Sequence, residues 1–182
     1  MGMIETERLT LRSWRDGDAT SFARHTNTPA VMRWLGGVKT PEFIAGVVAR
    51  LAAYEQERGF TFWAVERKAD GELLGFCGLK IANDAGSPVE GEYEAGWRFR
   101  EDVWGQGYAK EAAIASLAAA FGTFGAERVV SLTVEGNAPS RGLMERLGMR
   151  RRPELDYEGA DWAEGMVIVY AIGREEWAAR TS

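Results

Sequence analysis

The stretch Trp104-Gly105-Gln106-Gly107-Tyr108-Ala109-Lys110-Glu111-Ala112 decides how this sequence is interpreted. Its two glycines stand directly before an alanine-rich run, 109–124, that predicts a long helix. The N–H groups in the first turn of a helix have no partner within the helix, and the helix dipole adds partial positive charge there. A diphosphate fits such a junction. Because Gly105 and Gly107 lack Cβ atoms, phosphate oxygens would approach the main chain closely.

Two other phosphate-binding motifs do not match this stretch. The dinucleotide fingerprint requires a third glycine after the first strand of a βαβ unit. A Walker loop requires Gly-Lys followed by Ser or Thr. Taken alone, the two glycines are equally compatible with a tight turn that needs positive φ angles. The loop therefore indicates a diphosphate site only together with other parts of the chain.

Hydrophobic periodicity and turn signals predict the elements around the loop. Asp16 is the expected cap of a helix that runs to about Thr26, and Thr40-Pro41 is expected to start a helix that Gly59 ends. Asp70-Gly71 indicates a hairpin. The expected strands are 9–11, 60–67, 72–81, 90–100, 128–134, 149–152 and 166–172, and the expected helices are 16–26, 41–59, 109–124 and 139–147.

The order of these elements is β-α-α-β-β-β-α-β-α-β-β. The helix 109–124 joins strands 90–100 and 128–134 as a parallel crossover within an otherwise antiparallel sheet. We therefore expect an α/β (α+β) fold with a mixed, mostly antiparallel central sheet and helices on both faces. The length of 182 residues fits a single domain, 1–182.

Composition and charge exclude several classes of function. The net charge of −5 disfavours nucleic-acid binding, which needs a basic face. A single cysteine, Cys77, and a single histidine argue against a Cys/His metal site, so we expect no metal. No apolar run approaches the ~20 residues that span a bilayer, and the opening residues 1–8 carry acids without an apolar core. We expect a cytoplasmic protein without a membrane partner.

A second motif follows the loop after one helix and one strand. Asn137-Ala138-Pro139-Ser140 is a helix start in which the Asn137 side chain accepts a hydrogen bond from the Ser140 N–H. Leu147-Gly148-Met149 ends that helix. Capping explains these residues locally, but not their spacing from the loop.

Several spaced motifs together resemble the GNAT superfamily, in particular its ribosomal-protein N-terminal acetyltransferase branch (RimJ/RimL-like). Segment 104–109 resembles the acyl-CoA diphosphate loop of the family, although Trp104 stands where the general pattern has Gln or Arg. The similarity covers nearly the whole chain, and 150–165 is hard to align with the family. The matching motifs are 5–12, 29–36, 94–97, 104–109, 137–140 and 147–149.

The resemblance implies direct transfer of an acetyl group from acetyl-CoA to a primary amine, with the CoA between two splayed strands. A main-chain N–H within 97–99 would stabilise the oxyanion. The residues that the resemblance assigns to acetyl-CoA are Phe99, Trp104, Gly105, Gln106, Gly107, Tyr108, Ala109, Lys110 and Asn137.

Two residues are candidates for the chemistry of transfer. Glu94 matches the family's glutamate on the strand before the loop and is the candidate base or water-positioning group. Glu92 is expected on the same sheet face by the period-two rule, where two carboxylates would raise one pKa; solvated acids on a sheet face are an equally good interpretation. Ser140 is the candidate donor to the departing sulfur. Cys77 is expected to be a small buried hydrophobe, not a nucleophile.

The acceptor side is the least determined part of the sequence. Trp34, Glu92 and Tyr157 are the candidate substrate-binding residues. Segment 154–164 carries five carboxylates and two aromatic residues, which suggests attraction of a cationic acceptor, although a solvated loop explains it as well.

Three functions remain open at this point. The first is an N-acetyltransferase acting on a protein N-terminal α-amine or a small-molecule amine. The second is a non-catalytic acyl-CoA-binding sensor on the same fold, and the third is an acetyltransferase of amine antibiotics. The family also contains many dimers, which leaves a homodimer open.

Overall fold

Within residues 3–181, which the computed structural model describes, one sheet of eight strands has the order β1-β2-β3-β4-β5-β6-β8-β7. Its strands are β1 (Ile4–Glu5), β2 (Leu9–Arg12), β3 (Phe62–Arg67), β4 (Leu73–Ile81), β5 (Tyr93–Phe99), β6 (Arg128–Val134), β7 (Arg150–Arg151) and β8 (Val167–Gly173). The helices are α1 (Asp18–Thr26), α2 (Pro29–Met32), α3 (Pro41–Arg58), α4 (Tyr108–Gly122), α5 (Ala138–Arg146) and α6 (Arg174–Thr181). Residues 1, 2 and 182 of the expected domain lie outside the described part.

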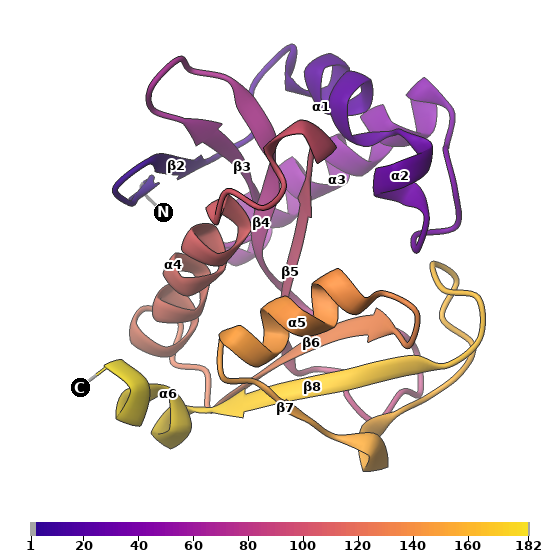
Figure 1. Cartoon of the computed structure of the whole chain (residues 1–182), viewed down its shortest axis with the longest axis vertical. Helices are drawn as coiled ribbons and strands as arrows, with labels where there is room; N and C mark the ends of the chain where they lie inside the picture. The colour runs from indigo at the N-terminus through magenta and orange to yellow at the C-terminus, as the bar shows by residue number, and fades with distance from the viewer. Residues whose placement is uncertain (1–2, 182) are drawn as a thin grey trace.

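The sheet changes direction at one place. All neighbouring strands pair antiparallel except β5 and β6, which are parallel and joined by α4. Their register contains only Tyr93↔Val129 and Glu94↔Val130, although β5 continues to Phe99 and β6 to Val134. Beyond these pairs the two strands diverge, and β6 and β8 cross the view at a steep angle to β4 and β5 (Figure 1).

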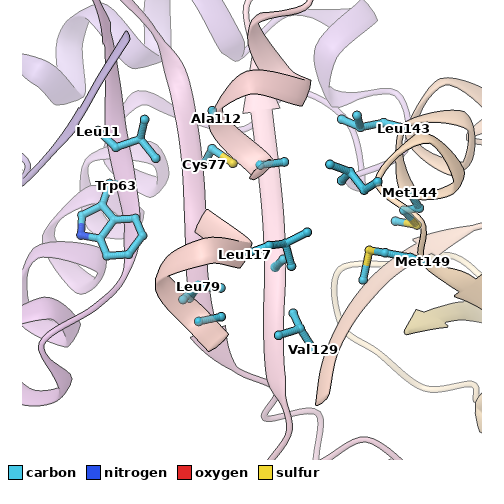
Figure 2. Packing of buried hydrophobic residues seen from close by; sticks show 14 of the residues in the cluster. Leu11, Trp63, Cys77, Leu79, Ala112, Leu117, Val129, Leu143, Met144 and Met149 are labelled. Carbon is cyan, nitrogen blue, oxygen red and sulfur yellow. The ribbon is translucent and has the colours of Figure 1, made fainter. Parts of the chain in front are cut away.

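Helices cover both faces of the sheet. On one face, α4 and α5 enclose the largest apolar cluster, in which Ala112 and Leu117 of α4 lie over Cys77 and Leu79 of β4 (Figure 2). On the other face, α1 and α3 pack around Phe22, Ile44 and Phe76 in a second cluster. The fold expected from the sequence, a mostly antiparallel mixed sheet with one parallel crossover and helices on both faces, is confirmed.

Most of the predicted starts and ends of elements are also confirmed. The Thr40 side chain accepts a hydrogen bond from the Phe43 N–H, with Pro41 at the first helical position and Gly59 at the C-cap with φ 79°. Asn137 caps α5 by accepting from the Ser140 N–H at 3.3 Å. In both helices a polar side chain satisfies an N–H group that the helix itself leaves unpaired.

The expected cap at Asp16 is wrong, since α1 begins two residues later with Gly17 at the N-cap. The Asp18 carboxylate accepts hydrogen bonds from the Arg12 guanidinium (2.7 and 3.1 Å) and from the Arg15 N–H (2.7 Å). This buried ion pair fixes where the helix starts. Arg12 lies six residues before Asp18 on strand β2, and the pattern of apolar residues does not show that the two side chains meet.

Four other elements differ from the expected list. The strand expected from residue 90 begins at Tyr93, because 84–91 form turns. The short strand β1 and the helices α2 and α6 are not among the expected elements. Trp177 of α6 stacks on Phe121 of α4 with 5.8 Å between ring centroids, a tertiary contact that stabilises a helix of only eight residues.

Gly75 allows β4 to pair closely with β5 beside the diverging strands. It has φ 148°, and a Cβ atom there would lie 2.0 Å from the main-chain oxygen of Arg98. Because backbone cannot move aside as a side chain does, we expect Gly75→Ala to lower the free energy of unfolding by about 2–5 kcal/mol, measured by urea denaturation.

Gly122 provides the matched control at the end of α4. A Cβ atom there would meet no atom within 4 Å, and its φ is not positive. Gly122→Ala should therefore raise the free energy of unfolding, by up to about 1 kcal/mol. Equal effects of the two substitutions would contradict this view of the β4–β5 pair.

Candidate active site

The divergence of β5 and β6 opens the sheet next to the predicted loop. The Ser131 hydroxyl of β6 donates a hydrogen bond of 2.8 Å to the Ala95 carbonyl oxygen of β5. This bond lies just past the last paired residues, so it holds the two strands together where the opening starts. Ser131 is buried and was not a predicted site residue.

The same bond shows which main-chain groups of β5 face the opening. N–H and C=O groups of alternate residues in a strand point to the same edge. Since the Ala95 carbonyl points toward β6, the N–H groups of Trp97 and Phe99 point toward β6 as well. The Arg100 N–H donates to the Leu74 carbonyl of β4, which is consistent with this alternation. Within 97–99, the candidate oxyanion donors are therefore Trp97 and Phe99.

The glycine loop connects β5 to α4 and leaves the helix start uncapped. Gly105 and Gly107 have φ angles of 73° and 81°, and Gly107 is the N-cap of α4 without any side-chain cap. The first N–H groups of α4 therefore have neither an intrahelical partner nor a capping side chain. Two bonds within the segment fix its shape: Trp104 Nε1 donates to the Phe99 oxygen (2.9 Å) and Gln106 Nε2 to the Asp102 oxygen (3.3 Å).

Thr6 and Arg8, between β1 and β2, contact the loop and the first turns of α4. Arg8 Nη1 donates to the Gln106 carbonyl oxygen (3.0 Å), and its guanidinium lies 4.3 Å from the centre of the Tyr108 ring. Arg8 Nε also donates to Glu111 Oε2 (2.6 Å), and Glu111 Oε1 accepts from the Thr6 hydroxyl (2.6 Å). Side chains about 100 positions apart thus hold the helix start, and sequence reasoning assigned them no role here.

A cavity of about 930 Å³ occupies the opening, within the size range of ligand sites. It brings together the loop, the diverging strands, the start of α5 and the α2 region. Ten of the predicted site residues line it: Trp34, Phe99, Trp104, Gly105, Gly107, Tyr108, Ala109, Lys110, Asn137 and Ser140.

Four predicted site residues do not line the cavity: Gln106, Glu92, Glu94 and Tyr157. Tyr157 is buried, and its hydroxyl donates to Asp84 Oδ2, which also accepts from Trp162 Nε1 at 3.1 Å. From segment 154–164, Trp162 is the lining residue. Glu92 precedes β5 and forms an ion pair with Arg128.

Glu94 is set back from the cavity on the face that α1 and α3 cover. Its side chain is 12% exposed, and its Oε2 atom lies 3.4 Å from Lys80 Nζ without a hydrogen bond from any described residue. Burial raises the pKa of Glu94, Lys80 lowers it, and the nearby Asp84 raises it further. The direction is the one expected from the sequence, but the acid that contributes is Asp84 and not Glu92.

Cys77, the single cysteine, is not among the residues that line the cavity. Cys77 is buried beside Ser116, and burial raises the pKa of its thiol to about 12. Among the described residues no group of three or more His, Cys, Asp or Glu side chains is placed to hold a metal ion. No helix in that part of the chain is long and apolar enough to cross a membrane.

Comparison with known proteins identifies the family. The sequence model of the acetyltransferase (GNAT) domain matches residues 8–150. The chain belongs to the GNAT acetyltransferase family. The GNAT chain is 34% identical over 147 residues to the uncharacterized protein YkkB of Bacillus subtilis, covering 80% of this chain and 84% of that one. It is 29% identical over 178 residues to the uncharacterized N-acetyltransferase YnaD of the same organism, covering 96% and 98%.

Solved GNAT structures share the fold. A GNAT-family acetyltransferase from Bacillus anthracis superposes with a TM-score of 0.78 at 26% identity, covering 96% of this chain and 99% of that one. The ribosomal-protein-S5-alanine acetyltransferase of Vibrio fischeri superposes with a TM-score of 0.74 at 16% identity, covering 97% and 99%. The RimJ/RimL-like enzymes are therefore structural neighbours of this GNAT chain.

Three arginines of the GNAT cavity were missed by sequence reasoning. Arg33, Arg98 and Arg146 line it, from the end of α2, from β5 and from the end of α5. The period-two rule places Arg98 on the same face of β5 as Glu94 and Gly96, a face that helices bury. An arginine on a sheet face that is expected to be buried could have indicated a functional residue at position 98.

The burial of Glu94 in this GNAT fold has a consequence for stability. A carboxyl group whose pKa is raised by folding is destabilising wherever it must be charged, and this cost disappears once it is protonated in both states. Glu94→Gln should therefore have a higher Tm than the parent at pH 7, and the difference should vanish below about pH 4.5, the ordinary value. Thermal unfolding followed across pH 4 to 8 measures it.

Glu92→Gln is the matched control. It removes the partner of Arg128, so its Tm at pH 7 should equal or fall below that of the parent. A Glu94→Gln variant that is less stable than the parent at pH 7 would contradict the assignment of Glu94 as a buried, poorly compensated acid.

Proposed function

We propose that this protein transfers an acetyl group from acetyl-CoA to a primary amine. The observation that carries the proposal is the uncapped, glycine-bearing start of α4 in a cavity that also contains the opening between β5 and β6. A diphosphate and an extended acyl-bearing chain need these two features side by side. Membership of the GNAT family supports the same assignment.

The loop fits the diphosphate of CoA on its own geometry. A Cβ atom at Gly105 would meet no atom within 4 Å, so the space above its main chain is open. The Gly107 N-cap leaves the helix N–H groups free for phosphate oxygens. Lys110 in the first turn of α4 lines the cavity and adds a positive charge. These residues would hold the diphosphate, and Asn137 would orient the pantetheine arm.

The residues of the opening would then act on the acetyl group. The N–H groups of Trp97 and Phe99 point into it and would donate hydrogen bonds to the acetyl oxygen as negative charge develops there. Ser140 lines the cavity at the start of α5 and would donate to the sulfur as the C–S bond breaks. Preorganised donors at both atoms lower the barrier without a covalent acyl-enzyme.

The amine must lose a proton as its nitrogen bonds to the acetyl carbon. Glu94 is the proposed acceptor of that proton, and a raised pKa makes it a better base than an ordinary carboxylate. Because Glu94 does not line the cavity, the proton would pass through a water molecule. An α-amino group, with a pKa near ~8, needs less help than a lysine amine near ~10.4.

Turnover tests the proposal. Purified protein should release CoA from acetyl-CoA only when a primary amine is present, and mass spectrometry of the amine should show a gain of one acetyl group. An acyl-CoA sensor on this fold would bind CoA and release none with any amine. That result would reject the acetyltransferase and favour the sensor.

Ser140→Ala gives a graded test of the mechanism. A thiol with a pKa near ~8.5 leaves without much assistance, so we expect kcat to fall by no more than about 100-fold, the lower end of general acid catalysis. The dissociation constant of CoA should stay unchanged. Complete loss of activity with normal CoA binding would instead point to Ser140 as a nucleophile.

A further inference from the structure

Arg98 is a partly buried cation of β5 in the wall of the cavity. Its guanidinium lies 5.6 Å from the centre of the Phe22 ring of α1 and 5.3 Å from that of Phe76 of β4. These rings hold the side chain from one side, and Arg98 is one of the residues that line the cavity. Its place in the cavity is thus set by two side chains of the apolar core.

No partner for this charge exists among the described residues. The Nε and Nη1 atoms of Arg98 are buried and have no hydrogen-bond partner there. Burial alone lowers the pKa of Arg98 to about 10, with no carboxylate acting in the opposite direction. At neutral pH the group is still charged. A buried, unpaired charge costs stability, so a fold that keeps one at a cavity wall suggests a use in binding.

Arg100, which follows the last residue of β5, shows the contrast. Arg100 donates to Asp102 at 2.7 Å and to Glu72 at 3.0 Å, so its charge is fully paired, and it does not line the cavity. The protein therefore has acids available next to this part of β5. They pair with Arg100, whereas no described residue accepts a hydrogen bond from Nε or Nη1 of Arg98.

The charge of the cavity wall points the same way. The described lining residues include Arg33, Arg98, Lys110 and Arg146, and no Asp or Glu. This holds although the whole chain has a net charge of −5. Lys110 and Arg146 belong to α4 and α5, beside the proposed CoA site, whereas Arg33 and Arg98 lie toward α1 and α2. If Lys110 and Arg146 contact CoA, the positive charges of Arg33 and Arg98 remain for the acceptor.

We propose that Arg98 binds a carboxylate of the acceptor, so that the substrate class is a small amino acid: a primary amine and a carboxylate joined by a short chain. The inference rests on the proposed acetyl transfer and names the acceptor of that same site. A guanidinium with buried N–H groups forms paired hydrogen bonds to a planar carboxylate. One carboxylate also matches one buried positive charge, whereas a phosphate dianion exceeds it.

The position of Arg98 limits the spacing of the two groups. It lies between Trp97 and Phe99, whose N–H groups are the proposed donors to the acetyl oxygen. The guanidinium is therefore no farther from the reacting carbon than one arginine side chain reaches. A carboxylate bound to it belongs to the same small molecule as the attacking amine, within a few carbon atoms.

This assignment reverses the sign of charge that segment 154–164 suggested. Asp156 of that segment pairs with Arg151, and Glu154 pairs with Arg152. Only Trp162 of the segment is among the described lining residues. Two of the five acids are thus paired with arginines, and none of the five is among the residues that line the cavity.

Matched substrates test the proposal. Glycine, β-alanine, alanine and leucine would be compared with their primary amides, and with aminomethylphosphonate as the phosphonate arm. Removing the carboxylate charge lowers the amine pKa, which makes the amides intrinsically more reactive. We nevertheless expect kcat/KM to be at least about 10-fold higher for the acids, as one charge-assisted pair provides. Amides that react equally well, or a preference for the phosphonate, would overturn the proposal.

Variants of Arg98 locate the effect. Arg98→Met should raise KM for the acids by about 10- to 100-fold, with kcat and the CoA dissociation constant nearly unchanged, and should leave the amides unaffected. Arg98→Lys should restore part of the affinity, since it keeps the charge and loses the planar fork. Arg100→Gln is the control and should leave the preference for acids intact. Equal losses for acids and amides in Arg98→Met would show a structural role.

Two further measurements distinguish a binding role of Arg98 from a structural role, and failure of the carboxylate site from failure of the acetyltransferase proposal. If Arg98 is a binding residue, Arg98→Met should have a Tm equal to or above that of the parent, because an unpaired buried charge is removed; a lower Tm would favour packing against Phe22 and Phe76. If no amine is acetylated, calorimetric titration of the same acids into CoA-loaded protein still decides. If the parent binds the acids and Arg98→Met does not, the carboxylate site is supported and the acetyltransferase is rejected. If the parent does not bind the acids, the carboxylate site is rejected.

Discussion

The early end of hydrogen bonding between β5 and β6 is the constraint on which the rest of the structure depends. After Glu94 and Val130 the two strands no longer pair, and the Ala95 carbonyl oxygen accepts a hydrogen bond from the Ser131 hydroxyl instead of from a main-chain N–H of β6. Main-chain donors that a regular sheet would use internally therefore point into a cavity. Strand edges inside a fold are otherwise unfavourable, because unpaired polar groups cost free energy when buried.

The elements around this opening are arranged to supply what an anionic ligand needs. The starts of α4 and α5 both meet the cavity, and Arg8 with Glu111 holds the first of them in place. Helix starts contribute partial positive charge, and the wall adds four cationic side chains among its described residues. Glu94 and Arg98 lie on one buried face of β5 with only weak or no compensation. Both are costly for stability, which is common where a fold serves binding or chemistry.

The sequence predicted the parts that depend on neighbouring residues. The parallel crossover, the caps at Thr40 and Asn137 and the uncapped glycine loop all follow from local patterns, and ten predicted site residues line the cavity. The parts it missed depend on which side chains meet in the folded chain. Asp18 starts α1 where Arg12 binds it, and Arg98 has no acid partner among the described residues, whereas Arg100 pairs with Asp102. Neither fact is visible in periodicity, since both depend on which side chains meet in three dimensions.

Calorimetric titration of CoA tests the central claim, that the main chain at the start of α4 grips the diphosphate. The parent would be compared with Gly107→Glu, and with Gly125→Glu, which changes an exposed glycine with a similar φ of 70° away from the cavity. We expect the parent and Gly125→Glu to bind CoA and Gly107→Glu not to bind it. No binding by the parent, or equal binding by Gly107→Glu, would contradict it.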